Sequence, residues 1–150
     1  MWRDENHNPR AYAMTFTPSQ FTPTKWDTVQ DKAAFAKQFV RFVQSDFGAQ
    51  HFTEKFYRRL SNTFGHIAHY NRGGFWSEFF TTTADKVRFL EQTLAYPCYG
   101  DPAWTYSDVE RALQEWLRAE AVLDQYRQRL AEETVAAERA ELARLQRKYG

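Results

Sequence analysis

Apolar side chains recur at spacings of three and four through the first half of this chain, which is the pattern of amphipathic helices. A first helix is expected to begin near Thr28 and to end at Gly48, and its stripe consists of Phe35, Phe39, Phe42, Val43 and Phe47. A second stripe is made of Phe52, Phe56, Leu60 and Phe64. This second helix is expected to stop at Gly65 or in an Asn71–Gly74 turn, with a short apolar segment, residues 75–80, after it.

The second half of the chain continues the helical pattern. Thr82 resembles an N-cap for a helix that carries Val87, Leu90 and Leu94 and stops before Pro97. Residues 96–106 are rich in turn formers and rings, as in a fixed, partly buried loop. Ser107 and Glu110 have the spacing of a capping box. They predict a helix without Gly or Pro until Gly150, whose core face comprises Val109, Leu113, Trp116, Leu123, Tyr126 and Leu130.

The length of this last helix predicts a protrusion. A helix over residues 107–149 would span roughly 65 Å, whereas a domain of this size is about 40 Å across. Residues 131–150 are rich in Ala, Glu and Arg, and Val135, Leu142 and Tyr149 recur every seven residues. Two alternatives remain open at this point: a solvated or partner-bound arm, or a homodimer that pairs through this end.

The N-terminal segment has a different composition. Residues 1–30 hold three of the five prolines, and Phe16-Thr-Pro-Ser-Gln20 is nearly repeated by Phe21-Thr-Pro-Thr24. Because Pro disfavours helix, we expect an extended arm, either strapped over the core or free as a linear motif. The sequence thus predicts a mainly α protein, a compact aromatic-rich helical bundle. Its expected parts are an arm (1–30), a helical core (31–130) and a protruding end (131–150).

Composition narrows the classes of protein. Twenty-six of the 150 residues are aromatic, so we expect a core built largely from rings. The net charge of +1 excludes a polycation or an acidic nucleic-acid mimic. Cys98 is the single cysteine, the first ten residues are polar, and no long apolar run occurs. We therefore expect a cytoplasmic protein that does not interact with membranes.

The charge is unevenly distributed. Residues 31–100 carry nine Lys and Arg against six Asp and Glu, and residues 101–150 carry eight against ten. The run from Lys55 to Ser77 has six rings and no carboxylate. Such a basic aromatic surface suits a phosphate backbone or a protein partner. The residues expected to bind a partner are Lys55, Arg58, Arg59, His66, His69, Tyr70, Arg72 and Trp76, with Tyr99 and Trp104 from the later loop.

Catalytic and metal-binding patterns are weak. His66 and His69 could share a helix face and, with Cys98, supply three zinc ligands, but a fourth ligand is not evident. Either histidine could also activate Cys98 as a nucleophile, although a lone cysteine between aromatic residues is more typical of a small buried side chain. The sequence therefore predicts a protein that is not an enzyme and has no cofactor or bound metal.

Four segments resemble small accessory proteins of bacterial phages and plasmids. They are Phe64-Gly-His-Ile-Ala-His-Tyr-Asn-Arg-Gly-Gly-Phe-Trp76, Phe89–Leu94, Pro97–Pro102 and Ser107–Ala112. The resemblance implies a context in which short proteins bind and disable a host machine, as anti-CRISPR and anti-restriction proteins do. It implies no catalytic residue.

Two functional hypotheses follow. In the first, the chain is a non-catalytic inhibitor or adaptor that docks on a host protein or nucleoprotein complex through Arg, Tyr and Trp side chains, the residues that dominate interface energetics. In the second, the same patch, residues 55–77, binds nucleic acid, and the C-terminal helix dimerises. A near-neutral charge and an acidic tail favour the first hypothesis.

Overall fold

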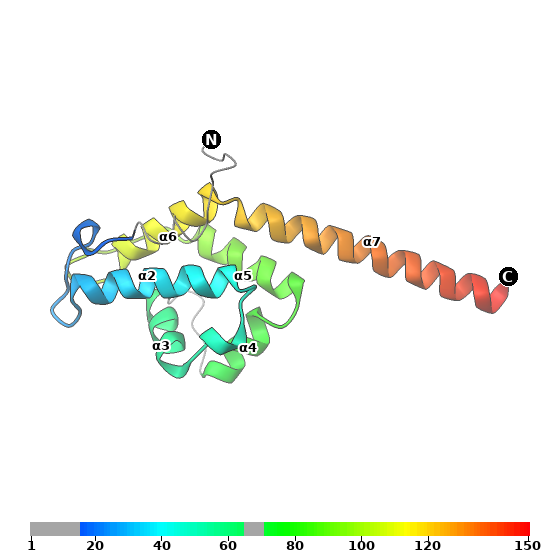
Figure 1. Cartoon of the computed structure of the whole chain (residues 1–150), viewed down its shortest axis with the longest axis horizontal. Helices are drawn as coiled ribbons and strands as arrows, with labels where there is room; N and C mark the ends of the chain where they lie inside the picture. The colour runs from blue at the N-terminus through cyan, green and yellow to red at the C-terminus, as the bar shows by residue number, and fades with distance from the viewer. Residues whose placement is uncertain (1–15, 65–70) are drawn as a thin grey trace.

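The structure, a computed structural model, describes residues 16–64 and 71–150. In these residues it contains six α-helices and no strand, which confirms the mainly α bundle. The elements are η1 (Pro18–Gln20), α2 (Val29–Gln44), η2 (Ala49–His51), α3 (Glu54–Thr63), α4 (Arg72–Phe79), α5 (Thr83–Ala95), α6 (Ser107–Ala119) and α7 (Val122–Tyr149). Figure 1 shows the first five helices gathered into one body, from which α7 projects.

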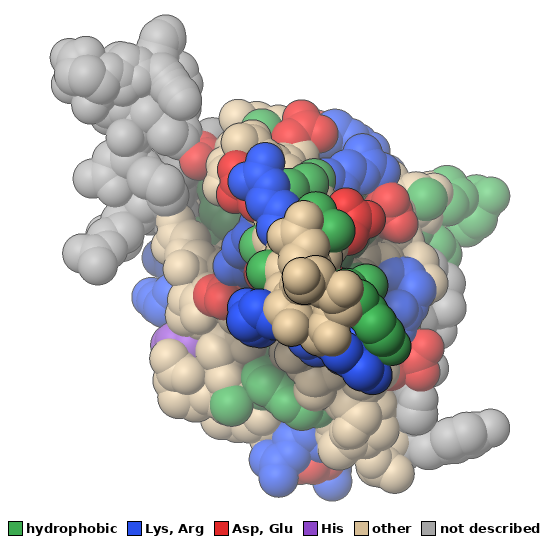
Figure 2. All heavy atoms as spheres, turned by 90° about the vertical axis from the view of Figure 1, so that its right-hand side faces the viewer, with side chains coloured by type: hydrophobic (Ala, Val, Ile, Leu, Met, Phe, Trp, Pro, Cys, Tyr) green, Lys and Arg blue, Asp and Glu red, His purple; other side chains and the backbone are tan. Residues whose placement is uncertain are grey.

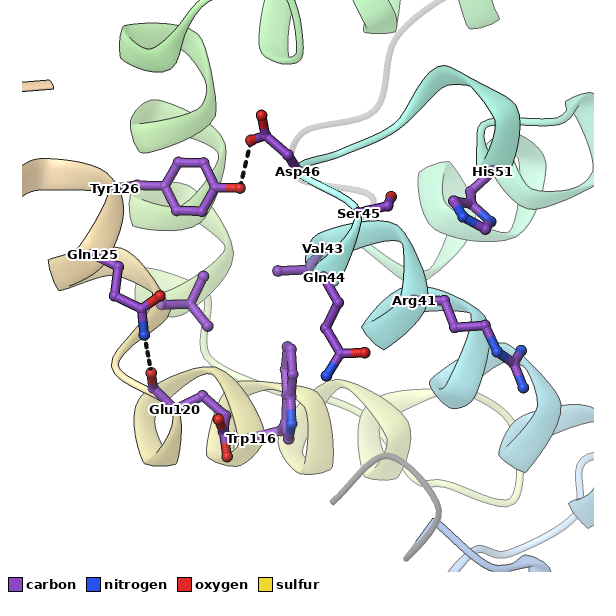
Figure 3. A pocket seen from close by; sticks show the side chains of 11 residues that line it. Arg41, Val43, Gln44, Ser45, Asp46, His51, Trp116, Glu120, Gln125 and Tyr126 are labelled. Atoms are coloured by element: carbon purple, nitrogen blue, oxygen red, sulfur yellow. Dashed lines mark hydrogen bonds between the residues drawn. The ribbon is translucent and has the colours of Figure 1, made fainter. Parts of the chain in front are cut away.

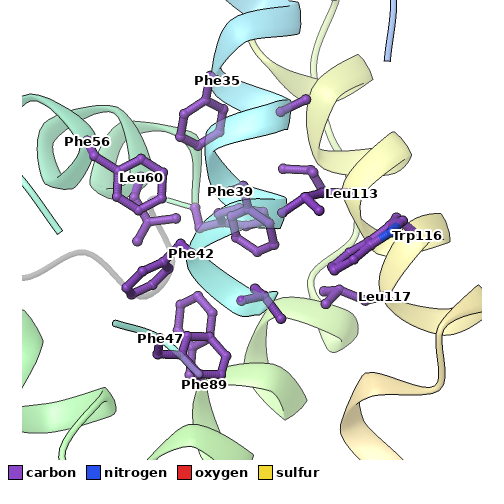
Figure 4. Close-up of a cluster of buried hydrophobic side chains, with 14 of the residues drawn as sticks. Phe35, Phe39, Phe42, Phe47, Phe56, Leu60, Phe89, Leu113, Trp116 and Leu117 are labelled. Atoms are coloured by element: carbon purple, nitrogen blue, oxygen red, sulfur yellow. The ribbon is translucent and has the colours of Figure 1, made fainter. Parts of the chain in front are cut away.

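The core surrounds α2 and is built from rings, as the composition predicts. Phe39, Val40 and Phe42 of α2 are fully buried (Figure 4). The ring of Phe42 lies 5.0 to 5.5 Å, between centroids, from four other rings: Phe47, Phe52, Phe56 and Phe80. Edge-to-face and offset contacts at this distance add about 0.5–1.5 kcal/mol per pair beyond the burial of apolar area. The core is therefore geometrically specific.

Two of the predicted helix starts are confirmed. Thr28 caps α2: its side chain accepts from Asp31 N at 3.0 Å, and Asp31 Oδ2 accepts from Thr28 N at 2.8 Å. Thr82 caps α5 by accepting from Asp85 N at 3.0 Å. These contacts satisfy backbone donors that a helix leaves unpaired in its first turn.

The residues after the second predicted helix differ from expectation. Residues 71–74 were expected as a turn, but Asn71 caps α4 and accepts from Gly74 N at 2.7 Å through its side chain. Gly73 and Gly74 are therefore inside a helix. The Asn cap and the burial of Phe75 and Phe79 against the core outweigh the low helix propensity of glycine.

The predicted capping box at Ser107 is wrong. Tyr106 occupies the N-cap position of α6, and no side chain caps this helix. Ser107 is fully buried, and its Oγ donates to the carbonyl oxygen of Gly100 at 2.9 Å. The hydroxyl is used to tie down the preceding loop, a tertiary contact that the local spacing of residues cannot reveal.

The uninterrupted helix predicted from Ser107 to Gly150 is also wrong at one point. Helix α6 ends at Ala119, and Ala121 has a left-handed backbone (φ 52°, ψ 40°) before α7 begins. This break redirects the chain so that Val122 and Tyr126 are buried against the core. Burial of these two side chains offsets the cost of about 1–2 kcal/mol for a left-handed alanine.

The protruding end is still present. Helix α7 has 28 residues and is about 42 Å long. From residue 131 onward nearly every side chain is exposed, and Figure 1 shows this part extending beyond the body. No helix among the described residues is both long and apolar enough to cross a bilayer. Helix α7 has the length but carries many charged side chains.

The described part of the N-terminal arm, residues 16–28, packs on the core. Phe16 and Phe21 are buried, and Thr22 N donates to Asp108 Oδ2 at 3.0 Å. The near-repeat of Phe-Thr-Pro thus places two rings as anchors for a strap. Residues 1–15 lie outside the described part.

Candidate binding surface

Two cations of the predicted patch, Arg58 on α3 and Arg72 on α4, are paired with a carboxylate just outside the run. Arg58 Nε contacts Glu54 Oε2 at 3.0 Å, and Arg72 Nε lies 3.8 Å from Glu54 Oε1. Glu54 precedes the carboxylate-free run by one residue and so was not counted in it. All three side chains are half-exposed or more, so these pairs are worth at most about 1 kcal/mol each. They do, however, offset part of the positive charge of the patch.

Arg59 faces away from this cluster. Its Nη2 donates to Asp27 Oδ1 at 3.2 Å, and its guanidinium lies 4.2 Å from the centre of the Tyr106 ring. Burial raises the pKa of Tyr106 to about 12, so the ring stays neutral at any physiological pH. Arg59 therefore joins three segments, α3, the strap before α2 and the loop before α6.

The remaining predicted residues separate into three groups. Trp76 is only partly exposed and packs on Phe52 and Phe80 at 5.3 and 5.6 Å, so it belongs to the edge of the core. Lys55 on α3 and Tyr99 in the loop before α6 are exposed. His66, His69 and Tyr70 lie outside the described residues. Of the described patch residues on α3 and α4, Lys55, Arg58 and Arg72 are therefore exposed, whereas Arg59 and Trp76 are partly buried.

Two exposed tryptophans stand out at one end of the molecule. Trp104 is 60% exposed, and Trp26, which sequence reasoning missed, is 69% exposed. Their rings meet edge to face with centroids 6.0 Å apart. Through Asp27, the neighbour of Trp26, this pair is continuous with Arg59. We call Trp26, Arg59 and Trp104 the tryptophan end. Figure 1 shows the segments that carry the two tryptophans, the turn before α2 and the loop before α6, at the opposite end of the molecule from the C-terminus.

A buried lysine holds the loop that carries Trp104. Lys32 Nζ has no exposed surface and donates to the carbonyl oxygens of Pro102 and Thr105 and to Asp108 Oδ1, each at 2.9 Å. Asp108 also accepts from the strap at Thr22. Since all three ammonium protons have acceptors, the charge is compensated; removing one partner of such a pair typically costs about 3–5 kcal/mol. The loop is therefore fixed to the bundle.

The turn that carries Trp26 is held by its own backbone and side chains. Thr24 Oγ1 accepts from Trp26 N at 3.1 Å and from Asp27 N at 2.8 Å, and Thr24 N donates to the carbonyl oxygen of Asp27 at 2.9 Å. Both tryptophans thus project from rigid backbone. The sequence Thr-Lys-Trp-Asp just before a capped helix could have indicated a turn. It could not have indicated that the ring of Trp26 is exposed.

A separate feature is an open groove of about 800 Å³ where α6 meets α7 (Figure 3). It is lined by Arg41, Val43, Gln44, Ser45, Asp46, His51, Trp116, Glu120, Val122, Gln125 and Tyr126. Its central carboxylate is already committed: Asp46 Oδ1 accepts from Tyr126 Oη at 2.7 Å and Arg129 Nη2 at 2.9 Å. Lys86 Nζ contacts the same oxygen at 3.2 Å. These bonds anchor α7, so we interpret this side of the groove as structural.

The contacts of Asp46 also set its electrostatics. Burial acts against the charged carboxylate, but hydrogen bonds from Arg129, Tyr126 and Lys86 outweigh it and lower the pKa of Asp46. The carboxylate is therefore charged at neutral pH, unlike a general acid.

Asp46 and the next residue, Phe47, both have left-handed backbone (φ 61° and 55°), and this turn, rather than the predicted Gly48, ends α2.

The environment of Cys98 is unlike that of a nucleophile. Its Sγ donates to Gln114 Oε1 at 3.4 Å, and burial followed by the negative charge of Glu110 raises the thiol's pKa. An activated thiolate needs the opposite shift. Among the described residues no group of three potential metal ligands comes together, and the two histidines considered for zinc fall in the undescribed segment.

Comparison with known proteins adds no relative. No protein family, curated protein or solved structure matches this chain. The resemblance to accessory proteins of phages and plasmids therefore stays a prediction.

Proposed function

We propose that this chain is a non-catalytic binding protein that docks on a larger folded protein through the tryptophan end. The observation that carries the proposal is the pair of exposed tryptophan rings on two immobilised loops. Large apolar side chains exposed side by side mark interaction sites on soluble proteins. Trp and Arg are also the side chains most enriched among residues that dominate binding energy.

Rigidity of the two loops favours this function further. Ordering flexible side chains and loops costs about 0.5–1.5 kcal/mol per immobilised side chain when a complex forms. At the tryptophan end much of the backbone ordering has already occurred on folding. Lys32 holds the loop that carries Trp104, and Thr24 holds the turn that carries Trp26. The partner expected is a protein with an apolar pocket for the two indole rings.

Pairing of the cations weakens the nucleic-acid alternative. A phosphate-binding surface needs cations free to replace condensed counterions. Arg58 and Arg72 share Glu54, and Arg59 is paired with Asp27. Any gain from phosphate contacts would be reduced by the loss of these pairs. We propose further that the chain belongs to a mobile genetic element and that its docking inhibits a host protein or nucleoprotein complex. The experiment below identifies the class of that target.

The proposal is tested by affinity purification of the tagged full chain from its own host, with and without nuclease. Wild type is compared with Trp26→Ala/Trp104→Ala and with a control, Glu115→Ala, which truncates an exposed side chain on α6 outside the tryptophan end. We expect a stoichiometric protein that survives nuclease, is retained by the control and falls at least about tenfold with the double variant. Reconstitution from two purified proteins then gives the affinity.

Two results would overturn the docking proposal. One is a partner captured equally by wild type and by the double tryptophan variant. The other is capture of nucleic acid alone, lost on nuclease treatment, with an affinity that falls steeply between 50 and 200 mM salt. That second result would establish the nucleic-acid reading of residues 55–77.

A further inference from the structure

The exposed end of α7 carries an apolar stripe that is separate from its core-facing side. Leu123, Tyr126 and Leu130 face the bundle. The stripe comprises Ala131, Val135, Leu142, Leu145 and Tyr149, and its four large members are 37–74% exposed. At 3.6 residues per turn, the stripe lies roughly 100° around the helix from the core face. It does not continue the core, and the bundle leaves it uncovered.

The spacing of the stripe is that of a two-helix seam. Positions 131, 135, 138, 142, 145 and 149 alternate steps of four and three, as a and d positions do in a coiled coil. Figure 2 looks along α7 from its C-terminal end and shows apolar and cationic side chains close together around the tip. Glu138 is the one polar residue in the series.

Charge along the arm is segregated by halves. Residues 131–141 carry four glutamates and one arginine, whereas residues 142–150 carry two arginines, one lysine and no carboxylate. A parallel pair of such arms would place like charges together. An antiparallel pair sets the acidic half of each arm against the basic half of the other, and it places Glu138 near the partner's basic half.

We propose that α7 is a self-association element, and that two copies of this chain pair antiparallel through the stripe at residues 131–149. The charge pattern selects a second copy as the occupant and antiparallel as the orientation. The seam is about 28 Å long and has four large apolar side chains per chain. An interface of this size belongs with the small, reversible ones, below roughly 1,200 Å².

The first experiment is sedimentation velocity of the full chain over micromolar to millimolar concentration. We expect a reversible monomer–dimer equilibrium. Leu142→Glu/Leu145→Glu should weaken it at least about tenfold, since two charges enter the seam of each chain. Ala137→Glu/Ala140→Glu is the matched control, because it adds the same charges on the other side of the exposed helix and should weaken it far less.

Salt and crosslinking report the orientation. Raising salt from 50 to 300 mM should weaken an antiparallel dimer and strengthen a parallel one, because screening removes attraction in the first case and repulsion in the second. In a Cys98→Ser background, Ala131→Cys mixed with Tyr149→Cys should form a disulfide-linked heterodimer. Neither variant should crosslink efficiently on its own.

A monomer at every concentration would overturn the proposal and leave the stripe free or covered by a different protein. Equal association of wild type and Leu142→Glu/Leu145→Glu would place any dimer elsewhere. Efficient crosslinking of the Tyr149→Cys variant with itself would show a parallel arrangement, which contradicts the charge argument.

Discussion

At Lys32, a full positive charge is buried away from water in the first turn of an amphipathic helix, α2. By residue type, this lysine is expected on the exposed side of the helix. In the structure it is one of the most deeply buried side chains. Its three acceptors come from residues 102, 105 and 108, more than sixty positions away along the chain. Single residues of this kind fix where the loops go, and their role depends on partners that no local pattern shows.

Glu110 is a buried carboxyl whose ionisation should make stability depend on pH. Burial raises its pKa from 4.5 to about 7, an effect that nearby Arg111 reduces and Asp108 increases. The folded carboxyl keeps its proton to about pH 7, whereas the unfolded one loses it near pH 4.5. The folded state therefore binds more protons between these values, and stability falls as pH rises through this window.

Replacing this carboxyl tests the prediction. Glu110→Gln should remove the loss and leave the protein more stable than wild type above pH 7, by up to about 3 kcal/mol. Urea unfolding at pH 5 and pH 8 measures the difference, and Glu115→Gln, exposed on the same helix, is the control. A wild-type protein whose stability does not change from pH 5 to pH 7.5 would contradict this assignment.

At the scale of elements, most helices form where the apolar period predicts them. The exceptions are α4, which was expected as a turn and a short apolar segment, and the break that divides one predicted helix into α6 and α7. Helix α4 includes two glycines, α6 starts without a side-chain cap, and α6 and α7 are separated at a residue that is neither Gly nor Pro. In each case a tertiary contact outweighs a local preference of about 1–2 kcal/mol: ring burial at α4, the Ser107–Gly100 hydrogen bond at α6, and burial of Val122 and Tyr126 at α7. Helix ends are therefore decided by what the element packs against.

The left-handed Ala121 between α6 and α7 offers a direct test of that strain. Ala121→Gly should stabilise the protein by about 0.5–1 kcal/mol, because glycine adopts positive φ freely but gains entropy when unfolded. Ala121→Val should destabilise it by more than 1 kcal/mol, since a β-branched side chain is strongly disfavoured at positive φ. Chemical denaturation of the two variants beside wild type measures both values. Destabilisation by glycine would mean that the break is not strained.

At the scale of the whole molecule, the chain divides into a ring-filled body and a charged arm, with distinct surfaces at its two ends. The tryptophan end lies at one end of the body, and the apolar stripe of α7 lies on the arm at the other (Figure 1). An antiparallel pair of arms would carry a tryptophan end at each far end of the dimer. Two linked docking surfaces bind a repeated target more tightly than one.

Removing the arm should leave the body intact. Residues 137–150 contribute no buried side chain, and the ion pair described among them, Arg144 with Glu141, lies within the arm itself. A chain ending at Ala136 should therefore unfold at a temperature within about 2 °C of wild type when both are measured at low micromolar concentration. A drop of 8 °C or more would show that the arm supports the fold of the body.

The sequence by itself determined the helical class, the positions of most helices, the ring-built core and the protruding C-terminal end. These follow from periodicity, composition and length, which are local or additive properties. Helix caps at Thr28 and Thr82 were also predictable, because a cap needs only a side chain and the backbone three residues later.

Only the tertiary structure decided which residues form the surface. Asp27 pairs with Arg59 across 32 residues, and Trp26 meets Trp104 across 78 residues. Whether a ring is a core residue, like Trp76, or an exposed one, like Trp26, depends on what covers it. Exposure and pairing are properties of segments brought together in space, and one sequence contains no measure of them.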